Sequence, residues 1–197
     1  MVPVFKGMKG LIFDCDGTLA DTMTIHTDSW QETMKRFGHD CPVDFLQPLR
    51  GMPAEEIVMR FNRKFGTNFD IKTLSDAKNR VSYERLKTVK PIMPVAKIAQ
   101  DFHGKLPMSV VSGGTAKNVL RTLRAIGMAD FFEAVITADD GLRPKPDPQM
   151  FIEAASRMGV PPELCEVFED GDPGFQAAQA AGMPFVDVTP YVNSGRH

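Results

Sequence analysis

The chain has 197 residues, of which 43% are hydrophobic and 24% are charged, and its formal net charge is -2. This length and composition fit a soluble globular protein with one substantial core and room for a small appended domain. The near-neutral charge argues against a nucleic-acid binder held by phosphate contacts. No apolar stretch is long enough to span a membrane, and the start of the chain lacks the apolar run of a signal peptide. We therefore expect neither a nucleic-acid nor a membrane partner.

The three cysteines, Cys15, Cys41 and Cys165, show no close pairing and no metal-ligand spacing. Such a pattern is typical of reduced, packed thiols in a cytoplasmic protein. We therefore expect a cytoplasmic location. The sequence carries no feature that sets an oligomeric state.

Short apolar runs alternate with helical patterns along most of the chain. The alternation indicates an α/β fold, with a doubly wound (Rossmann-like) parallel sheet covered by helices on both faces. Gly127 and Gly159 stand where helix C-caps are expected. The predicted strands are 11–13, 108–111, 134–136, 167–168 and 185–188, and the predicted helices are 95–102, 115–126, 148–158 and 174–181.

Residues 20–90 differ from the rest because they show helical patterns and no convincing strand. A segment of this length is too long for a loop inside a compact domain. We predict that it forms a small α-helical cap domain, inserted into a core domain made of residues 1–19 and 91–197. The alternative, that these helices pack on the sheet as ordinary layers, stays open. The helical patterns are 26–38, 53–66 and 70–87, and the expected cap core includes Phe37, Phe45, Met59, Phe61 and Phe65.

Polar residues follow the predicted strands at their carboxyl ends, where ligands bind in open parallel sheets. Asp14 and Asp16 follow the first strand, and Ser112 follows the second. The third strand leads on to Lys145. The fourth ends at Glu169 and Asp170.

Asp14 and Asp16 flank Cys15, which raises the question of which side chain is reactive. Alternate residues of an extended segment share a face, so the two carboxylates point together and the thiol points away. A cysteine nucleophile would need a cationic or anion-binding loop, whereas the sequence that follows, "DGTLAD", is acidic. We therefore predict that Cys15 is a packing residue.

Two carboxylates at this spacing suit phosphoryl transfer through an aspartyl-phosphate. One attacks phosphorus, and the other protonates the leaving oxygen and later activates water. The negative charge must then be offset, for which Mg²⁺ in an oxygen cage and a lysine are suitable. Asp14, Asp170 and Glu169 offer hard oxygen ligands, and Lys145 offers the positive charge.

The segment "DCDGTLADT" resembles the DxDGT motif of the haloacid dehalogenase-like hydrolases. Three later positions resemble further motifs: Ser112 after "SVV", Lys145 in "RPKPDP", and the acidic "VFEDGDPG" of the β-phosphoglucomutase-like branch. The resemblance implies that Asp14 is the nucleophile, Asp16 the acid/base, and Ser112 and Lys145 the phosphate holders. It also implies Mg²⁺ bound by Asp14, the Asp16 carbonyl and Asp170, with Glu169 as a direct ligand or a neighbour of the ligands.

Three further residues are predicted to contact substrate: Gly113, beside Ser112 at a helix start; His26, which precedes Trp30 by a helical turn; and Arg50. Within the branch, sugar-phosphate mutases carry a cap arginine that grips a second phosphate, and Ala54 stands at the equivalent position here. The C-terminal half resembles bacterial fructose-1-phosphate phosphatases. These features favour a phosphatase for a small phosphorylated metabolite.

The same residues are compatible with two other functions. Arg50 can replace the missing cap arginine, which keeps a β-phosphoglucomutase-like mutase as the alternative. A receiver-like phospho-switch, which is not an enzyme, also combines an aspartate, a serine, a lysine and Mg²⁺. Asp16 argues against the receiver because it would shorten the lifetime of the phospho-aspartate, and receivers lack a cap.

Overall fold

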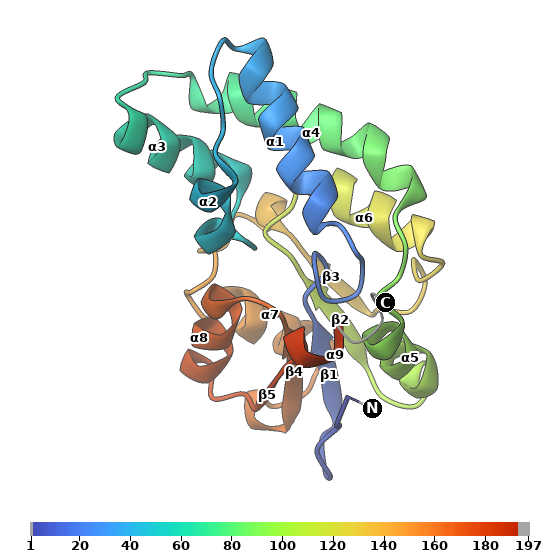
Figure 1. Ribbon diagram of the computed structural model, residues 1–197. Helices are drawn as coiled ribbons and strands as arrows, with labels where there is room; N and C mark the ends of the chain where they lie inside the picture. The colour runs from blue at the N-terminus through green and yellow to red at the C-terminus, as the bar shows by residue number, and fades with distance from the viewer. Residues whose placement is uncertain (1, 193–197) are drawn as a thin grey trace.

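The computed structural model describes residues 2–192, which form a five-stranded parallel sheet with helices on both faces (Figure 1). The strand order is β3-β2-β1-β4-β5, so β1 is central. The predicted fold class is confirmed. Residues 1 and 193–197 of the predicted core segments lie outside the described residues. The strands are β1 (Gly10–Phe13), β2 (Met108–Val111), β3 (Ala134–Ile136), β4 (Cys165–Glu169) and β5 (Phe185–Asp187).

Alternating side chains of β1 enter two separate clusters of buried residues. Leu11 and Phe13 pack on one face of the sheet, and Ile12 packs on the other. This alternation follows from the two-residue period of a strand. The first face is covered by α5 (Met93–Phe102), α6 (Ala116–Ala125) and α9 (Thr189–Val192), and the second by α7 (Gln149–Met158) and α8 (Asp172–Ala180). None of the helices in residues 2–192 is long and apolar enough to cross a bilayer.

Strand β4 is longer than the predicted 167–168 because charged residues continue it in both directions. Glu166 is fully buried, and its two carboxylate oxygens each accept the main-chain N–H of Phe5 at 3.1 Å. A hydrogen-bonded acid inside a buried strand interrupts the apolar pattern from which strands are predicted.

Residues 20–90 form helices beyond the carboxyl ends of the strands (Figure 1). Their buried apolar residues, including Trp30 and Val58, make a third cluster separate from the two on the sheet. The chain leaves and re-enters the sheet layer at one place, where Asp21 N–H donates to Lys90 O and Ile92 N–H donates to Leu19 O. The helices are α1 (Met23–Arg36), α2 (Val43–Leu46), α3 (Ala54–Phe65) and α4 (Ile71–Arg85). Short 3₁₀ turns lie at Gln47–Leu49, Leu86–Thr88, Ala138–Asp140 and Pro162–Leu164.

The expectation for the apolar residues of this third cluster was partly wrong. Phe45 and Phe61 are buried, whereas Phe37, Met59 and Phe65 are 37%, 43% and 41% exposed. The inward face of α3 carries Ile57, Val58 and Phe61, so Met59 lies on the outer side and Phe65 at the last turn. The sequence does not show α2 either, because four residues are too few to display a helical period.

Candidate active site

Asp14 lies at the end of the central strand and is 2% exposed. Its main-chain N–H continues the sheet by donating to Phe168 O at 2.9 Å. Cys15 points to the opposite face, where it is part of the buried cluster under α5 and α6. Burial, and then the neighbouring charges of Asp16 and Asp14, raise the pKa of the Cys15 thiol well above its ordinary value. A thiol in this environment is a packing residue.

Lys145 is a buried cation next to Asp14 and is 3% exposed. Its Nζ donates to Asp14 Oδ1 at 2.8 Å, to Glu169 Oε2 at 2.7 Å and to Val111 O at 3.1 Å. Burial disfavours a charged lysine, but the carboxylates of Asp14 and Glu169 outweigh it and raise the pKa of Lys145. The ammonium is therefore held beside the carboxylate of Asp14.

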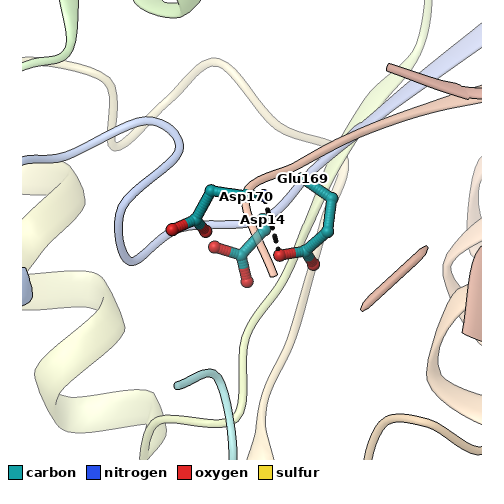
Figure 2. Close-up of side chains that lie close together, drawn as sticks. All are labelled: Asp14, Glu169 and Asp170. Atoms are coloured by element: carbon teal, nitrogen blue, oxygen red, sulfur yellow. Dashed lines mark hydrogen bonds between the residues drawn. The ribbon is translucent and has the colours of Figure 1, made fainter. Parts of the chain in front are cut away.

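Three carboxylates, from Asp14, Glu169 and Asp170, lie together at the ends of β1 and β4 (Figure 2), with one oxygen of each within 4.8 Å of the others. Burial, and next the charge of Glu169, raise the pKa of Asp14 and raise that of Asp170 to about 7. The positive charge of Lys145 therefore does not neutralise the three acids. Hard oxygen donors with surplus negative charge fit a divalent cation such as Mg²⁺.

Glu169 is held by groups of the protein on both of its carboxylate oxygens. Oε2 accepts from Lys145, and Oε1 accepts the main-chain N–H of Asp170 at 3.0 Å and of Gly171 at 3.1 Å. A Cβ on Gly174, in the first turn of α8, would lie 2.0 Å from Oε2, so only glycine leaves room for this carboxylate. Asp170 instead accepts from the Thr18 hydroxyl at 3.2 Å.

Asp16 faces the same side as Asp14 and accepts two side-chain hydrogen bonds. Ser112 Oγ lies 3.0 Å from Oδ2, and His26 Nε2 lies 2.9 Å from Oδ1. Burial would raise the pKa of Asp16, but His26 and Ser112 lower it below its ordinary value. With its pKa lowered, Asp16 is an ionised carboxylate.

The other ring nitrogen of His26, Nδ1, lies 3.1 Å from Lys78 Nζ on α4. Burial, and then the positive charge of Lys78, lower the pKa of His26, while burial lowers that of Lys78 to about 8. Because an ammonium only donates, Nδ1 accepts from it and Nε2 carries the proton donated to Asp16. A relay of hydrogen bonds thus runs from the 20–90 segment to Asp16.

Above these residues lies a cavity of about 260 Å³. Six of the residues predicted for the site line it: Asp14, Asp16, His26, Arg50, Ser112 and Gly113. Lys145 and Glu169 lie beneath it, in contact with Asp14, and Asp170 lines an adjacent hollow to which Arg50 also belongs. The structure therefore brings all the predicted site residues to one region of the molecule.

Sequence reasoning missed Lys78. The sequence feature that could have identified it is its position on the buried face of a helix, in line with Leu74 and Ser82. An unpaired charge there would be costly. It also lies over the Trp30 ring, with Nζ 5.5 Å from the ring centroid. Such a lysine needs a polar partner, and the nearest is His26.

Comparison with known proteins places the chain in a family. A family model described as haloacid dehalogenase-like hydrolase matches residues 11–188. The fructose-1-phosphate phosphatase YqaB of Escherichia coli is 36% identical over 186 residues, which cover 94% of this chain and 98% of that protein. The β-phosphoglucomutase of Bacillus subtilis is 27% identical over 190 residues, covering 92% and 83%.

A solved structure shares the fold. A crystal structure of CbbY from Rhodobacter sphaeroides in complex with phosphate superposes with a TM-score of 0.81 at 22% identity, covering 90% of this chain and 84% of that one. With the family model spanning both the sheet and the inserted helices, the chain belongs to the haloacid dehalogenase-like hydrolases.

Proposed function

We propose that the protein is a Mg²⁺-dependent phosphatase that hydrolyses a small sugar phosphate, such as fructose 1-phosphate, through an aspartyl-phosphate on Asp14. The observation that carries the proposal is the buried Asp14–Lys145 pair, of which Asp14 lines the cavity together with Asp16 and Ser112. The name of the E. coli relative supports the substrate.

Asp14 is suited to attack phosphorus. Lys145 holds Oδ1, and Oδ2 accepts no hydrogen bond from any residue in the 2–192 range, so that oxygen is available as the nucleophile. Ser112 Oγ, which also accepts the Gly114 N–H at 3.0 Å, lies in the turn between β2 and α6 and is placed to hold a phosphate oxygen.

We propose that the cation is held by Asp14, the main-chain carbonyl of Asp16 and Asp170. When bound, Mg²⁺ offsets the negative charge of the phosphoryl group and its carboxylate neighbours. Because both oxygens of Glu169 are already engaged, we assign it to holding Lys145 rather than to binding the metal directly.

Asp16 is proposed to move the proton. In its protonated form it gives the proton to the leaving oxygen, and as a carboxylate it then takes one from the water that attacks the aspartyl-phosphate. His26 and Lys78 keep its carboxylate oriented between these steps. A receiver-like switch has no use for such a group, and family membership favours an enzyme.

The test is to replace Asp14 by asparagine and to assay p-nitrophenyl phosphate together with a panel of phosphate esters in the presence of Mg²⁺. Asp14→Asn should abolish turnover, with a loss on the order of 10⁴-fold or more, while the fold survives. Asp101→Asn, an exposed acid paired with Lys97, is the matched control and should keep full activity. Normal turnover in Asp14→Asn would falsify the mechanism.

A phosphosugar mutase is the second candidate, favoured by one observation. Arg50 lines the cavity, and within residues 2–192 no hydrogen bond or ion pair holds it, so it is available for a second phosphate. Supplying glucose 1-phosphate with the matching bisphosphate separates the two functions. The phosphatase releases inorganic phosphate, whereas a mutase yields the 6-isomer.

We also propose that residues 20–90 act as a cap domain over the core made of residues 1–19 and 91–197. The separate buried cluster of this segment and its position over the cavity support this division. A metabolite substrate and three free, buried cysteines fit a cytoplasmic enzyme.

A further inference from the structure

Gly113 lies directly beneath a loop of the 20–90 segment. A Cβ on Gly113 would be 2.2 Å from the carbonyl oxygen of Gly51 and 3.1 Å from its carbonyl carbon. Atoms of a packed interior do not approach so closely, and a backbone oxygen cannot swing aside as a flexible side chain can. Gly113 is not among the glycines with positive φ, so its own backbone does not require glycine. Glycine is required at this position because the loop approaches so closely.

This contact joins the two walls of the cavity. The loop residues Arg50, Gly51, Met52 and Pro53 line it from one side, and Gly113 with its neighbours Ser112 and Gly114 lines it from the other. The Gly51–Gly113 contact therefore closes the cavity next to the Asp16–Ser112 pair.

The opposite edge of the inserted helices is attached differently. Asn118 on α6 donates to Asn79 O on α4 at 3.3 Å. The Lys117 ammonium and the Arg121 guanidinium each lie 4.5 Å from the centroid of the Tyr83 ring. Side chains thus anchor α4 to α6, whereas no backbone hydrogen bond in the described range joins Gly51 to Gly113. At the loop edge the printed contact between Gly51 and Gly113 is therefore one of packing alone.

We infer that Gly113 is a positioning residue: by lacking a side chain, it lets the loop 50–53 seat directly on the Ser112–Gly114 turn and close the cavity around the leaving group. A methyl group at position 113 would hold the loop off by about 1 Å. The inference rests on the proposed function, because it assigns the closure to hydrolysis of a phosphate ester.

The consequence depends on the size of the leaving group. A sugar fills the cavity and depends on the loop for orientation, whereas acetyl phosphate presents a leaving group too small to reach it. A loss confined to the sugar ester therefore reports closure, because a defect in phosphate binding weakens turnover of both esters.

The experiment compares Gly113→Ala with wild type on fructose 1-phosphate and acetyl phosphate. We expect kcat/KM to fall on the order of tenfold or more further for the sugar ester than for acetyl phosphate. Gly10→Ala adds the same methyl at the far end of β1, where it meets side-chain atoms at 3.2 Å or more, and should change neither value. Equal losses on both esters, or no loss on either, would overturn the inference.

A distance measurement tests the same inference without turnover. Spin labels at Met59→Cys on α3 and Ile152→Cys on α7 occupy exposed positions, and the native cysteines are buried. Gly113→Ala should give a longer, broader distance distribution than the labelled parent, and an unchanged distribution would overturn the inference. If wild type hydrolyses neither ester, the proposed function fails, and the distance measurement still tests the role of Gly113.

Discussion

The floor of the site and the side formed by residues 20–90 are built in different ways. On the floor, Asp14, Lys145 and Glu169 are at most 3% exposed, and each bonds to a strand end or to another of the three. On the other side, Arg50 is exposed, and the loop beside it meets the core through a bare backbone contact. The fold therefore fixes the proposed reacting groups firmly and leaves the proposed substrate side less constrained, as catalysis by preorganised charge requires.

After Asp14→Asn, the largest effect on turnover should come from disturbing the floor without replacing its charged residues. Gly174→Ala places a Cβ in the space of the Glu169 carboxylate and so displaces the partner of Lys145. We expect kcat for p-nitrophenyl phosphate to fall on the order of 10²-fold, with circular dichroism unchanged because alanine favours a helix. Gly10→Ala is the control. Near wild-type kcat in Gly174→Ala would show that Glu169 does not position the lysine.

A smaller effect is expected from the hydrogen-bond relay on the opposite side. Lys78→Met removes the positive charge that lowers the pKa of His26, so that pKa should rise. We expect kcat to fall about tenfold because His26 no longer has a fixed tautomer. NMR titration of the His26 ring measures the pKa.

Lys72→Met is the matched control for this relay, since Lys72 lies on the same helix and lines the same cavity but pairs with Asp76. The relay is refuted if the pKa of His26 responds equally to both substitutions.

The smallest effect on turnover is expected at Glu166, whose substitution should change the stability of the fold instead. Burial raises the pKa of Glu166 from 4.5 to about 7, against the opposing hydrogen bond from Phe5. Between these values the folded protein keeps a proton that the unfolded chain releases, so this group lowers stability as the pH rises through that window. Glu166→Gln should be more stable than wild type by up to ~3 kcal/mol at pH 8 and about equal near pH 4.

Urea unfolding at the two pH values measures this difference, and the turnover of Glu166→Gln should match that of wild type. Asp14 and Asp170, whose pKa values are raised as well, contribute the same pH trend in both proteins and cancel in the comparison. A stability difference independent of pH would contradict the prediction.

Most of the floor was predictable because strand ends are predictable. A parallel sheet brings the residues after each strand to one edge, and the two-residue period separates Asp14 and Asp16 from Cys15. The side formed by residues 20–90 was harder to predict. Lys78 contributes through a tertiary contact with His26, 52 residues away, that no local pattern encodes. The predicted β4 was too short for a related reason. Glu166 interrupts the apolar run, and its hydrogen-bond partner, Phe5, is distant in sequence.

The exit and return of the 20–90 segment have a broader consequence. Leu19 to Asp21 and Lys90 to Ile92 are hydrogen-bonded side by side, so the excursion begins and ends at one point of the scaffold. Its length and sequence can therefore diverge without shifting β1 or α5. Such a modular arrangement lets the inserted segment change while Asp14 and Glu169, at the ends of β1 and β4, keep their places.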